Sequence, residues 1–295
     1  CRGSRREKMI YLALAIAASV TVGSMLKVSE MAGRNRVAVA FINYVVAVVT
    51  SLILWYFADK PGFSPETIAC GAFGGVAWVA GLLVMMYAIK RTGVAITSAM
   101  VRVAIVVPIL LSVVMWNEIP NAVQIIGIGL ALFAVVLLSF DQARTKTGFD
   151  YSWILLSAGV LLSSGSARVA SKLFAEIGPT EQKPSYLIVL FMVAVLLTSA
   201  WLLVRKVPVL RGDLRYGVMV GIPNALSGLF LIWALQLLPA IAVFPTAAAA
   251  GVVLLVLLGT FVWKEKLSKK ALAGISVAVA AIVLVNLNDL DALGF

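Results

Sequence analysis

Two arginines, Arg102 and Arg168, stand inside long apolar runs of this chain. The first lies in "SAMVRVAIVVPILL" and the second in "LLSSGSARVASKLF". A guanidinium stays charged at physiological pH, and its planar fork binds carboxylate or phosphate through two parallel hydrogen bonds. The two residues therefore predict binding of an anion within apolar surroundings. Arg102 is the first candidate, because Arg168 lies nearer the end of its run and could extend its head group to the surface.

Small polar and aromatic side chains accompany the arginines. Ser157, Ser164 and Arg168 fall on one helical stripe, and Ser98 lies one turn before Arg102. Further candidates for binding a substrate are Asn224, Trp78, Tyr87 and Trp233. Each has a structural alternative, since serines in membrane helices often bond neighbouring helices and an arginine can be satisfied by carbonyls and water. Pro108, Pro223 and Pro245 each remove a backbone donor, so they are candidate hinges or static kinks.

The composition identifies the surroundings of these residues. Of 295 residues, 62% are hydrophobic and only 13% are charged, whereas soluble domains are about 25% charged. The apolar residues form blocks long enough to cross a hydrocarbon core. The sequence predicts an all-α membrane protein with ten transmembrane helices, near 10–28, 37–57, 67–89, 94–115, 122–140, 152–174, 185–204, 216–238, 241–262 and 270–287.

The chain repeats itself at half its length. "WNEIPNAVQIIGIGLALFAVVLL" from Trp116 aligns without gaps with "WKEKLSKKALAGISVAVAAIVLV" from Trp263, which pairs Ala131 with Ala278 and Ala134 with Ala281. Five spans per half is an odd number, so the halves enter the membrane from opposite sides, as in many secondary transporters. We predict two inverted five-helix repeats, 10–140 and 152–287, flanked by tails 1–9 and 288–295. The N-terminal tail reads as an added or processed end, with Met9 as the expected start.

With these motifs, the chain resembles the EamA-like ten-helix permeases of the drug/metabolite transporter superfamily. The resemblance covers nearly the whole chain and includes "YAIKRTGVAITSAM" and "WNEIP". It implies import or export of small metabolites through a central cavity and does not identify the substrate. The family often has Gly-Glu where this chain has Asn117-Glu118 and Lys264-Glu265, which weakens assignment to a particular subfamily.

Several functional classes are disfavoured by residue type. The chain has no histidine and two cysteines, so we expect no metal site and no cofactor. The predicted spans carry no catalytic constellation and the chain has no nucleotide-binding loop, so we expect neither an enzyme nor a nucleotide-driven pump. All thirteen acidic residues fall in predicted loops or at helix ends. Exchange or facilitated diffusion is therefore favoured over coupling to a proton carried within the membrane.

We expect a secondary transporter of a small anionic or zwitterionic metabolite, working by alternating access in the inner membrane of a prokaryote. The alternatives are an exporter of cationic drugs and a membrane scaffold that does not transport. The expected partners are the substrate and the lipid bilayer, without nucleic acid, and a homodimer is left open. The net charge of +11 comes mostly from short loops. The loops on one side carry 15 basic residues, against 7 on the other side, of which three lie in loops and four in the N-terminal tail. This asymmetry places both termini outside the cytoplasm, whereas the resemblance places them inside.

Overall fold

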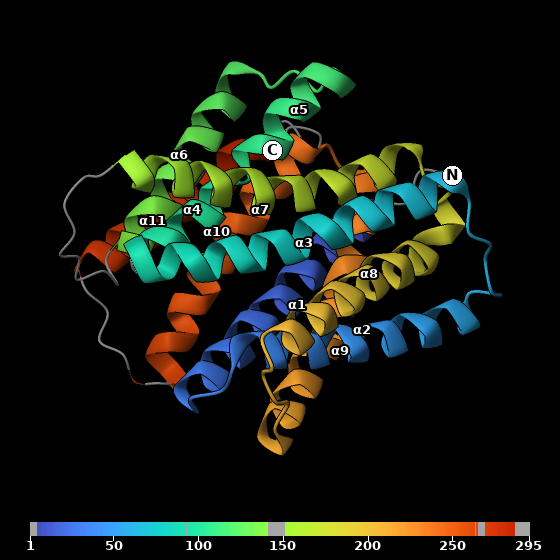
Figure 1. Ribbon diagram of the computed structural model, residues 1–295. Coiled ribbons are helices and arrows are strands. Elements are labelled where there is room, and N and C mark those ends of the chain that lie inside the picture. Colours follow the sequence, from blue (N-terminus) through green and yellow to red (C-terminus); the bar gives the residue numbers. More distant parts are fainter. Residues whose placement is uncertain (1–4, 93, 141–150, 263, 265–268, 287–295) are drawn as a thin grey trace. The chain divides into compact units, whose positions relative to one another are not determined.

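The computed structural model describes residues 5–92, 94–140, 151–262, 264 and 269–286, although the side chains of some of these, including Ser98 and Ser157, fall outside the description. All regular elements in the described part are helices (Figure 1). They are α1 (Arg5–Met31), α2 (Arg36–Phe57), α3 (Pro65–Thr92), α4 (Val94–Val103), α5 (Val106–Trp116), α6 (Ala122–Phe140), α7 (Tyr151–Ile177), the short 3₁₀ helix η1 (Thr180–Gln182), α8 (Lys183–Val204), α9 (Arg211–Leu237), α10 (Ala240–Val262) and α11 (Lys269–Val285).

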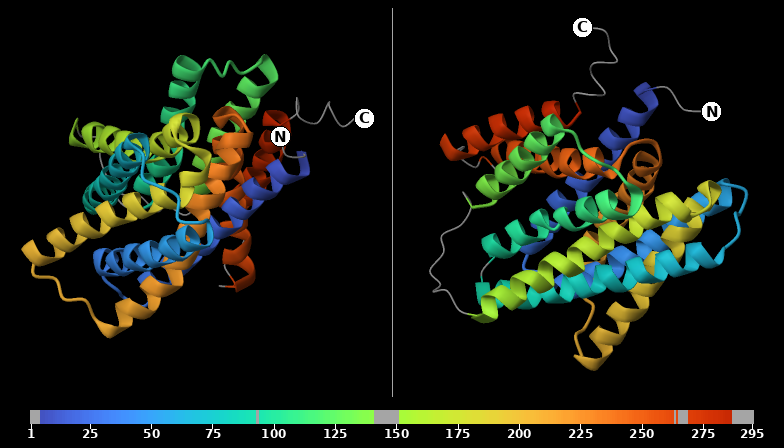
Figure 2. Two further views of the ribbon diagram at one scale, coloured as in Figure 1. Left: turned by 90° about the vertical axis from the view of Figure 1, so that its right-hand side faces the viewer. Right: turned by 90° about the horizontal axis from the view of Figure 1, so that it is seen from above.

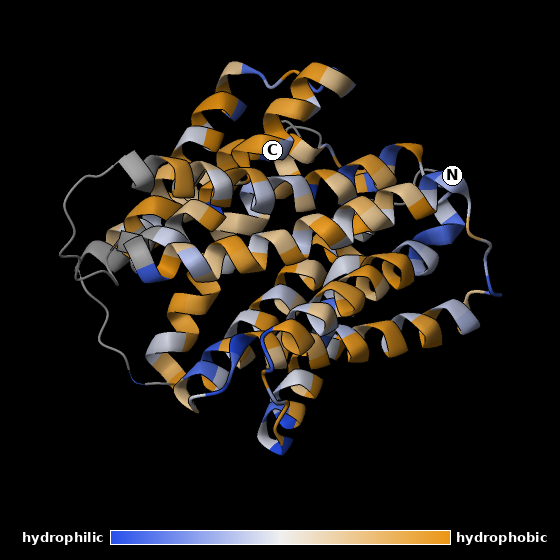
Figure 3. Cartoon of the chain, viewed as in Figure 1, coloured by the Kyte–Doolittle hydropathy of each residue, from blue (hydrophilic) through white to orange (hydrophobic). Residues whose placement is uncertain are grey.

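Six of these helices are long and apolar enough to cross a membrane: Met9–Met31, Arg36–Phe57, Pro65–Lys90, Thr180–Val204, Arg211–Leu237 and Ala240–Val262. Shorter apolar helices occupy Met100–Trp116, Ala122–Leu137 and Leu272–Val285. Large apolar side chains such as Leu110, Val114 and Ile125 are exposed, and hydrophobic residues predominate along the helices (Figure 3). A hydrocarbon solvent accounts for this exposure, so the predicted all-helical membrane protein is confirmed.

One predicted span, 94–115, is two helices rather than one. α4 ends at Val103 and α5 begins at Val106. Pro108 has no N–H, so the carbonyl of Ala104 lacks its usual partner four residues later. That carbonyl instead accepts the Val107 N–H at 3.2 Å, and the Ile105 N–H reaches Arg102 O at 3.4 Å. The break leaves Pro108 in the first turn of α5, where a missing N–H costs little.

The helices form two compact units. The first unit comprises Cys1–Val79 and Ala170–Leu237, and the second comprises Ala80–Val169 and Leu238–Phe295. Both α3 and α7 contribute one end to each unit, so each unit takes helices from both halves of the chain. The division between the two units therefore differs from the division between the two sequence halves.

In the first unit, α9 packs against α1 and α2, and α2 also packs against α8. α2 and α9 run parallel, because Gly217 of α9 lies on Ile42 and Gly221 lies on Val46, further along both helices. A Cβ at Gly217 would approach Ile42 Cβ to 2.4 Å, so only glycine allows this contact. Gly75 of α3 similarly lies on the backbone of α8, since a Cβ there would be 2.5 Å from Leu190 O. Gly71, one turn before Gly75, also lies on α8, since a Cβ there would be 2.8 Å from Val189 Cβ.

In the second unit, α6 and α11 lie side by side and both pack on α10 (Figure 2). Their core is built from small and β-branched residues: Ala131, Ala134, Val135, Ala249, Val252, Val253, Ala278 and Ala281. The alanine pairs that the sequence repeat makes equivalent therefore meet in one cluster. Short side chains let the helix backbones approach closely, which favours van der Waals packing in a solvent that is itself apolar.

Candidate functional site

The two intramembrane arginines belong to the second unit, and we call them the arginine pair. Arg102 lies in the last turn of α4, and Arg168 lies in α7. Both are half-buried, and their positive charges repel each other. Arg168 Nη1 donates a hydrogen bond to Ser164 O at 2.8 Å. Within the described part of the chain, the Arg102 side chain makes no hydrogen bond and no ion pair.

Helix packing and the α4–α5 break position the arginine pair. α7 packs tightly on α5, because a Cβ at Gly165 would lie 2.5 Å from Val107 Cβ. Gly81 of α3 approaches Ser164, which a Cβ would meet at 3.7 Å. The break places Arg102 at a helix C-terminus, whose partial negative charge favours a cation by about 0.3–1 kcal/mol. That term is smaller than the cost of a central membrane arginine, roughly 2.5–3.5 kcal/mol.

The second unit offers little negative charge to balance the arginine pair. Among its described residues the only carboxylate is Glu118, in the α5–α6 connection. Glu118 Oε2 accepts the Ile241 N–H at 3.2 Å and so caps the first turn of α10. Asn117 turns the chain into this position with a left-handed φ of 53°. The "WNEIP" motif is therefore a turn that also carries a helix cap.

The other predicted binding residues divide between the two units. Ser164 and Tyr87 lie in the second unit, with Tyr87 half-exposed, while Ser98 and Ser157 occupy α4 and α7 with side chains outside the described residues. Trp78, Asn224 and Trp233 lie in the first unit. Asn224 is buried and donates from Nδ2 to Asn43 Oδ1 of α2 at 3.1 Å. Trp78 makes a side-chain hydrogen bond with Tyr44. These two residues thus have partners inside the protein.

The predicted hinge prolines take two kinds of position. Pro108 stands in the first turn of α5, directly after the helix break. Pro223 and Pro245 lie inside α9 and α10, both of which continue past them. Whether any of the three moves during a functional cycle stays a prediction.

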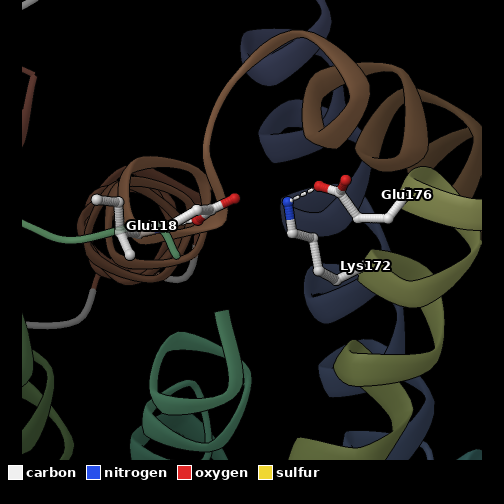
Figure 4. A network of polar contacts seen from close by, with 4 residues as sticks. Glu118, Lys172 and Glu176 are labelled. Atoms are coloured by element: carbon white, nitrogen blue, oxygen red, sulfur yellow. Dashed lines mark hydrogen bonds and ion pairs between the residues drawn. The ribbon is translucent and has the colours of Figure 1, made fainter. Parts of the chain in front are cut away.

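Two lysines near the ends of predicted spans are buried on helices. Lys172 and Lys183 are 1% and 2% exposed. α7 continues past the predicted end at 174 to Ile177, and α8 begins at Lys183, two residues before the predicted start at 185. Lys172 pairs with Glu176 one turn later, as Figure 4 shows. This i, i+4 spacing, and Pro184 as a helix-start residue, were signals in the sequence that could have revealed both helix ends.

Lys183 is held by an aromatic face. Its Nζ lies 3.9 Å from the ring centroid of Trp233 and donates to Thr180 O. Trp233 in turn stacks on Tyr11 of α1, with ring centroids 5.1 Å apart. Glu181 adds electrostatic attraction from an exposed position. A desolvated cation over an indole is strongly stabilised, so this lysine–tryptophan pair fixes the start of α8 to the end of α9.

The described residues contain no group of three or more histidine, cysteine, aspartate or glutamate side chains that could hold a metal ion. The chemistry that the arrangement offers is non-covalent binding. Two guanidinium groups in apolar surroundings present donors that match the oxygens of a carboxylate or phosphate.

Comparisons with known proteins identify the family. Residues 9–140 and 151–287 each match the EamA-like transporter family. An uncharacterized protein of Haemophilus influenzae is 27% identical over 292 residues, covering 93% of this chain and 96% of the relative. A crystal structure with 16% sequence identity covers 98% of this chain and 100% of its own, with a TM-score of 0.76. The family match spans nearly all of both halves, and we conclude that this integral membrane protein belongs to the EamA-like transporter family of drug/metabolite transporters.

Proposed function

We propose that the protein is a secondary transporter of a small anionic or zwitterionic metabolite, which it binds at Arg102 and Arg168. The candidate substrates are amino acids, organic acids and phosphorylated compounds. Membership of a transporter family supports transport as the activity. The positive charges of Arg102 and Arg168 in the second unit support a negatively charged group on the substrate.

The observation that carries the proposal is the pairing of two like charges inside membrane helices. Each arginine is costly in an apolar environment, and their mutual repulsion adds to that cost. A bound anion would offset both terms, because it neutralises the pair and occupies donors that Arg102 leaves unused. Ser164 O already orients Arg168, so part of the binding geometry exists before the ligand arrives.

Alternating access is the mechanism we propose, with exchange or facilitated diffusion as its mode. The two separate matches to one family, in the first and second halves of the chain, support an internal repeat. Ten crossings result when α4 and α5 together count as one. An odd number of crossings per repeat inverts the second repeat relative to the first. The proposed location is the inner membrane of a prokaryote, which similarity to a bacterial protein supports.

The structure disfavours export of cationic drugs. A cation would require a buried carboxylate or an open aromatic cage. In the first unit, Trp233, which stacks on Tyr11, already faces an internal cation, Lys183. In the second unit, the charges at the candidate site are positive.

Ligand-dependent thermal stabilisation in detergent tests the proposal, followed by uptake into proteoliposomes. The panel contains amino acids, organic acids, phosphorylated compounds and tetraphenylphosphonium as a cation. We expect an anion or zwitterion to stabilise the wild type. Arg102→Gln should weaken its binding about 10- to 100-fold, the loss of one bidentate charge-assisted contact. Arg102→Lys, which keeps the charge but loses the fork, should give an intermediate loss.

Lys60→Gln is the matched control, since Lys60 is an exposed cation of the first unit. Without ligand, Arg102→Gln should be at least as stable as the wild type, because it removes an unneutralised charge. The proposal is wrong if Arg102→Gln and Arg168→Gln both keep wild-type anion affinity, or if only the cation stabilises the protein.

A further inference from the structure

One end of the first unit is strongly basic, and we call it the basic end. It is formed by the α1–α2 and α8–α9 connections, which meet because α2 and α9 run parallel. The guanidinium of Arg34 lies against Gly212, where a Cβ would be 2.3 Å from Nη1. The first connection carries Lys27, Arg34 and Arg36, and the second carries Arg205, Lys206, Arg211 and Arg215.

The two acidic residues at the basic end leave most of this charge uncompensated. Glu30 pairs with Arg36 at 3.0 Å. Asp213 is buried and accepts the Leu210 N–H at 2.9 Å, which caps the start of α9. The first residues of the second connection, Arg205 and Lys206, are exposed, as are Arg211 and Arg215 at the start of α9. The basic end therefore presents an excess of positive charge to its surroundings.

The opposite end of the first unit has a different balance of basic and acidic side chains. There the α2–α3 connection meets the start of α8, since Ser185 Oγ donates to Pro61 O at 3.1 Å. Its described side chains include three bases, Lys60, Lys172 and Lys183, and four acids, Asp59, Glu66, Glu176 and Glu181. Among the side chains that the structure describes in the first unit, the excess of positive charge thus lies at the basic end.

An open groove lies at the basic end, where α8 ends beside α2. Its lining is mainly apolar and includes Phe41, Leu202, Leu203, Val207 and Val209, and Lys206 is its only charged residue. The chain turns back here through Lys206, whose φ is 52°. The Lys206 N–H donates to Leu203 O and the Val207 N–H to Leu202 O, which closes the end of the helix. Glycine is favoured in this left-handed position, and the chain has a lysine instead.

We propose that this groove binds an anionic phospholipid, with an acyl chain on its apolar wall and the headgroup phosphate at Lys206. α8 is long and apolar enough to cross the membrane and ends at the groove, which would put the groove at the depth where acyl chains meet headgroups. Trp201, one turn before Arg205, is typical of that interface. The surrounding positive charge selects anionic over zwitterionic headgroups. The site is independent of the transported substrate and lies within one unit.

Titration of delipidated protein with dioleoylphosphatidylglycerol or dioleoylphosphatidylcholine, followed by native mass spectrometry and thermal unfolding, tests the proposal. We expect the wild type to bind phosphatidylglycerol more tightly. Lys206→Gly keeps the left-handed backbone and removes the charge, so it should fold normally and lose about fivefold of this preference. Lys60→Gly is the matched control, because Lys60 is also exposed, has a φ of 53° and lies at the opposite end. It should keep the wild-type preference.

A second variant tests the groove itself. Ser199 also lines it, and Ser199→Trp should fill the space while every basic residue remains. We expect this variant to lose the tightly bound lipid. The proposal is overturned if Ser199→Trp binds phosphatidylglycerol like the wild type, because charge alone then attracts the lipid. It is equally overturned if Lys206→Gly and Lys60→Gly have the same preference, or if the groove is occupied by a second copy of the chain in lipid-free detergent.

Discussion

Replacing Trp233 by leucine would remove the aromatic face that holds Lys183. This lysine is 2% exposed and its Nζ lies 3.9 Å from the ring centroid. A desolvated cation–π contact contributes about 2 kcal/mol. Its loss leaves a buried ammonium with the Thr180 carbonyl as its remaining close partner. We expect Trp233→Leu to lower the free energy of unfolding by at least about 2 kcal/mol and the unfolding midpoint by about 4–8 °C.

Lys183→Met is the second single variant of a double-mutant cycle with Trp233→Leu. Methionine has a similar length and no charge, so it removes the cost of a buried ammonium together with its cation–π contact. Exchanging a buried charge for an apolar side chain is often neutral or stabilising. In the Lys183→Met background, Trp233→Leu should therefore cost about 2 kcal/mol less than in the wild type.

Thermal unfolding in detergent, followed by size-exclusion chromatography of the heated samples, measures all four proteins of the cycle. Lys60→Met is the control, because Lys60 lies over Tyr56 at 4.9 Å in an exposed setting. It should change stability by less than about 1 kcal/mol. If the effects of Trp233→Leu and Lys183→Met simply add, the two side chains are not coupled and our explanation of the buried lysine is wrong.

Three further predictions follow from packing, charge and orientation. Gly165→Ala should destabilise the protein by about 1–3 kcal/mol by forcing α7 from Val107, whereas Gly129→Ala should not, since nothing lies within 4 Å of its Cβ. In a Val107→Gly background, which removes the Cβ that the new methyl group would meet, Gly165→Ala should cost less in thermal unfolding. Counterflow of labelled substrate in proteoliposomes should persist after the proton gradient is collapsed, and its disappearance without a membrane-potential effect would exclude simple exchange. The basic end should face the cytoplasm. In a variant that lacks Cys70 and Cys1, the thiol introduced by Lys206→Cys should therefore react with an impermeant maleimide only after the cells are permeabilised. Labelling of intact cells would contradict this prediction and indicate that the basic end faces away from the cytoplasm.

The class of the protein was predictable from sequence because its signals are local. A long apolar block needs an apolar solvent wherever it folds, so composition and block length were enough to predict a helical membrane protein. Most predicted helix boundaries agree with the structure to within a few residues. α2 was predicted as 37–57 and spans Arg36–Phe57. The family was predictable too, since its motifs lie within continuous stretches such as "WNEIP".

The α4–α5 break was only partly visible in the sequence. Pro108 marked a disturbed helix, but the sequence did not show whether the chain would kink or end there. The structure places the break at Ala104 and Ile105, four and three residues earlier, where the lost hydrogen bond falls. It also places Arg102 at a helix end, which the sequence alone did not indicate.

What only the tertiary structure decided is which residues meet. Arg102 and Arg168 were chosen separately from the sequence, and packing of α7 on α5 and α3 brings their charges together. The amide of Asn224, a candidate for binding substrate, is paired with Asn43 across the parallel contact of α2 and α9. Lys183 looked like a loop cation and is a buried one. Hydropathy depends on each residue and its near neighbours, whereas burial and pairing depend on helices far apart in the chain, so residue type alone does not determine them.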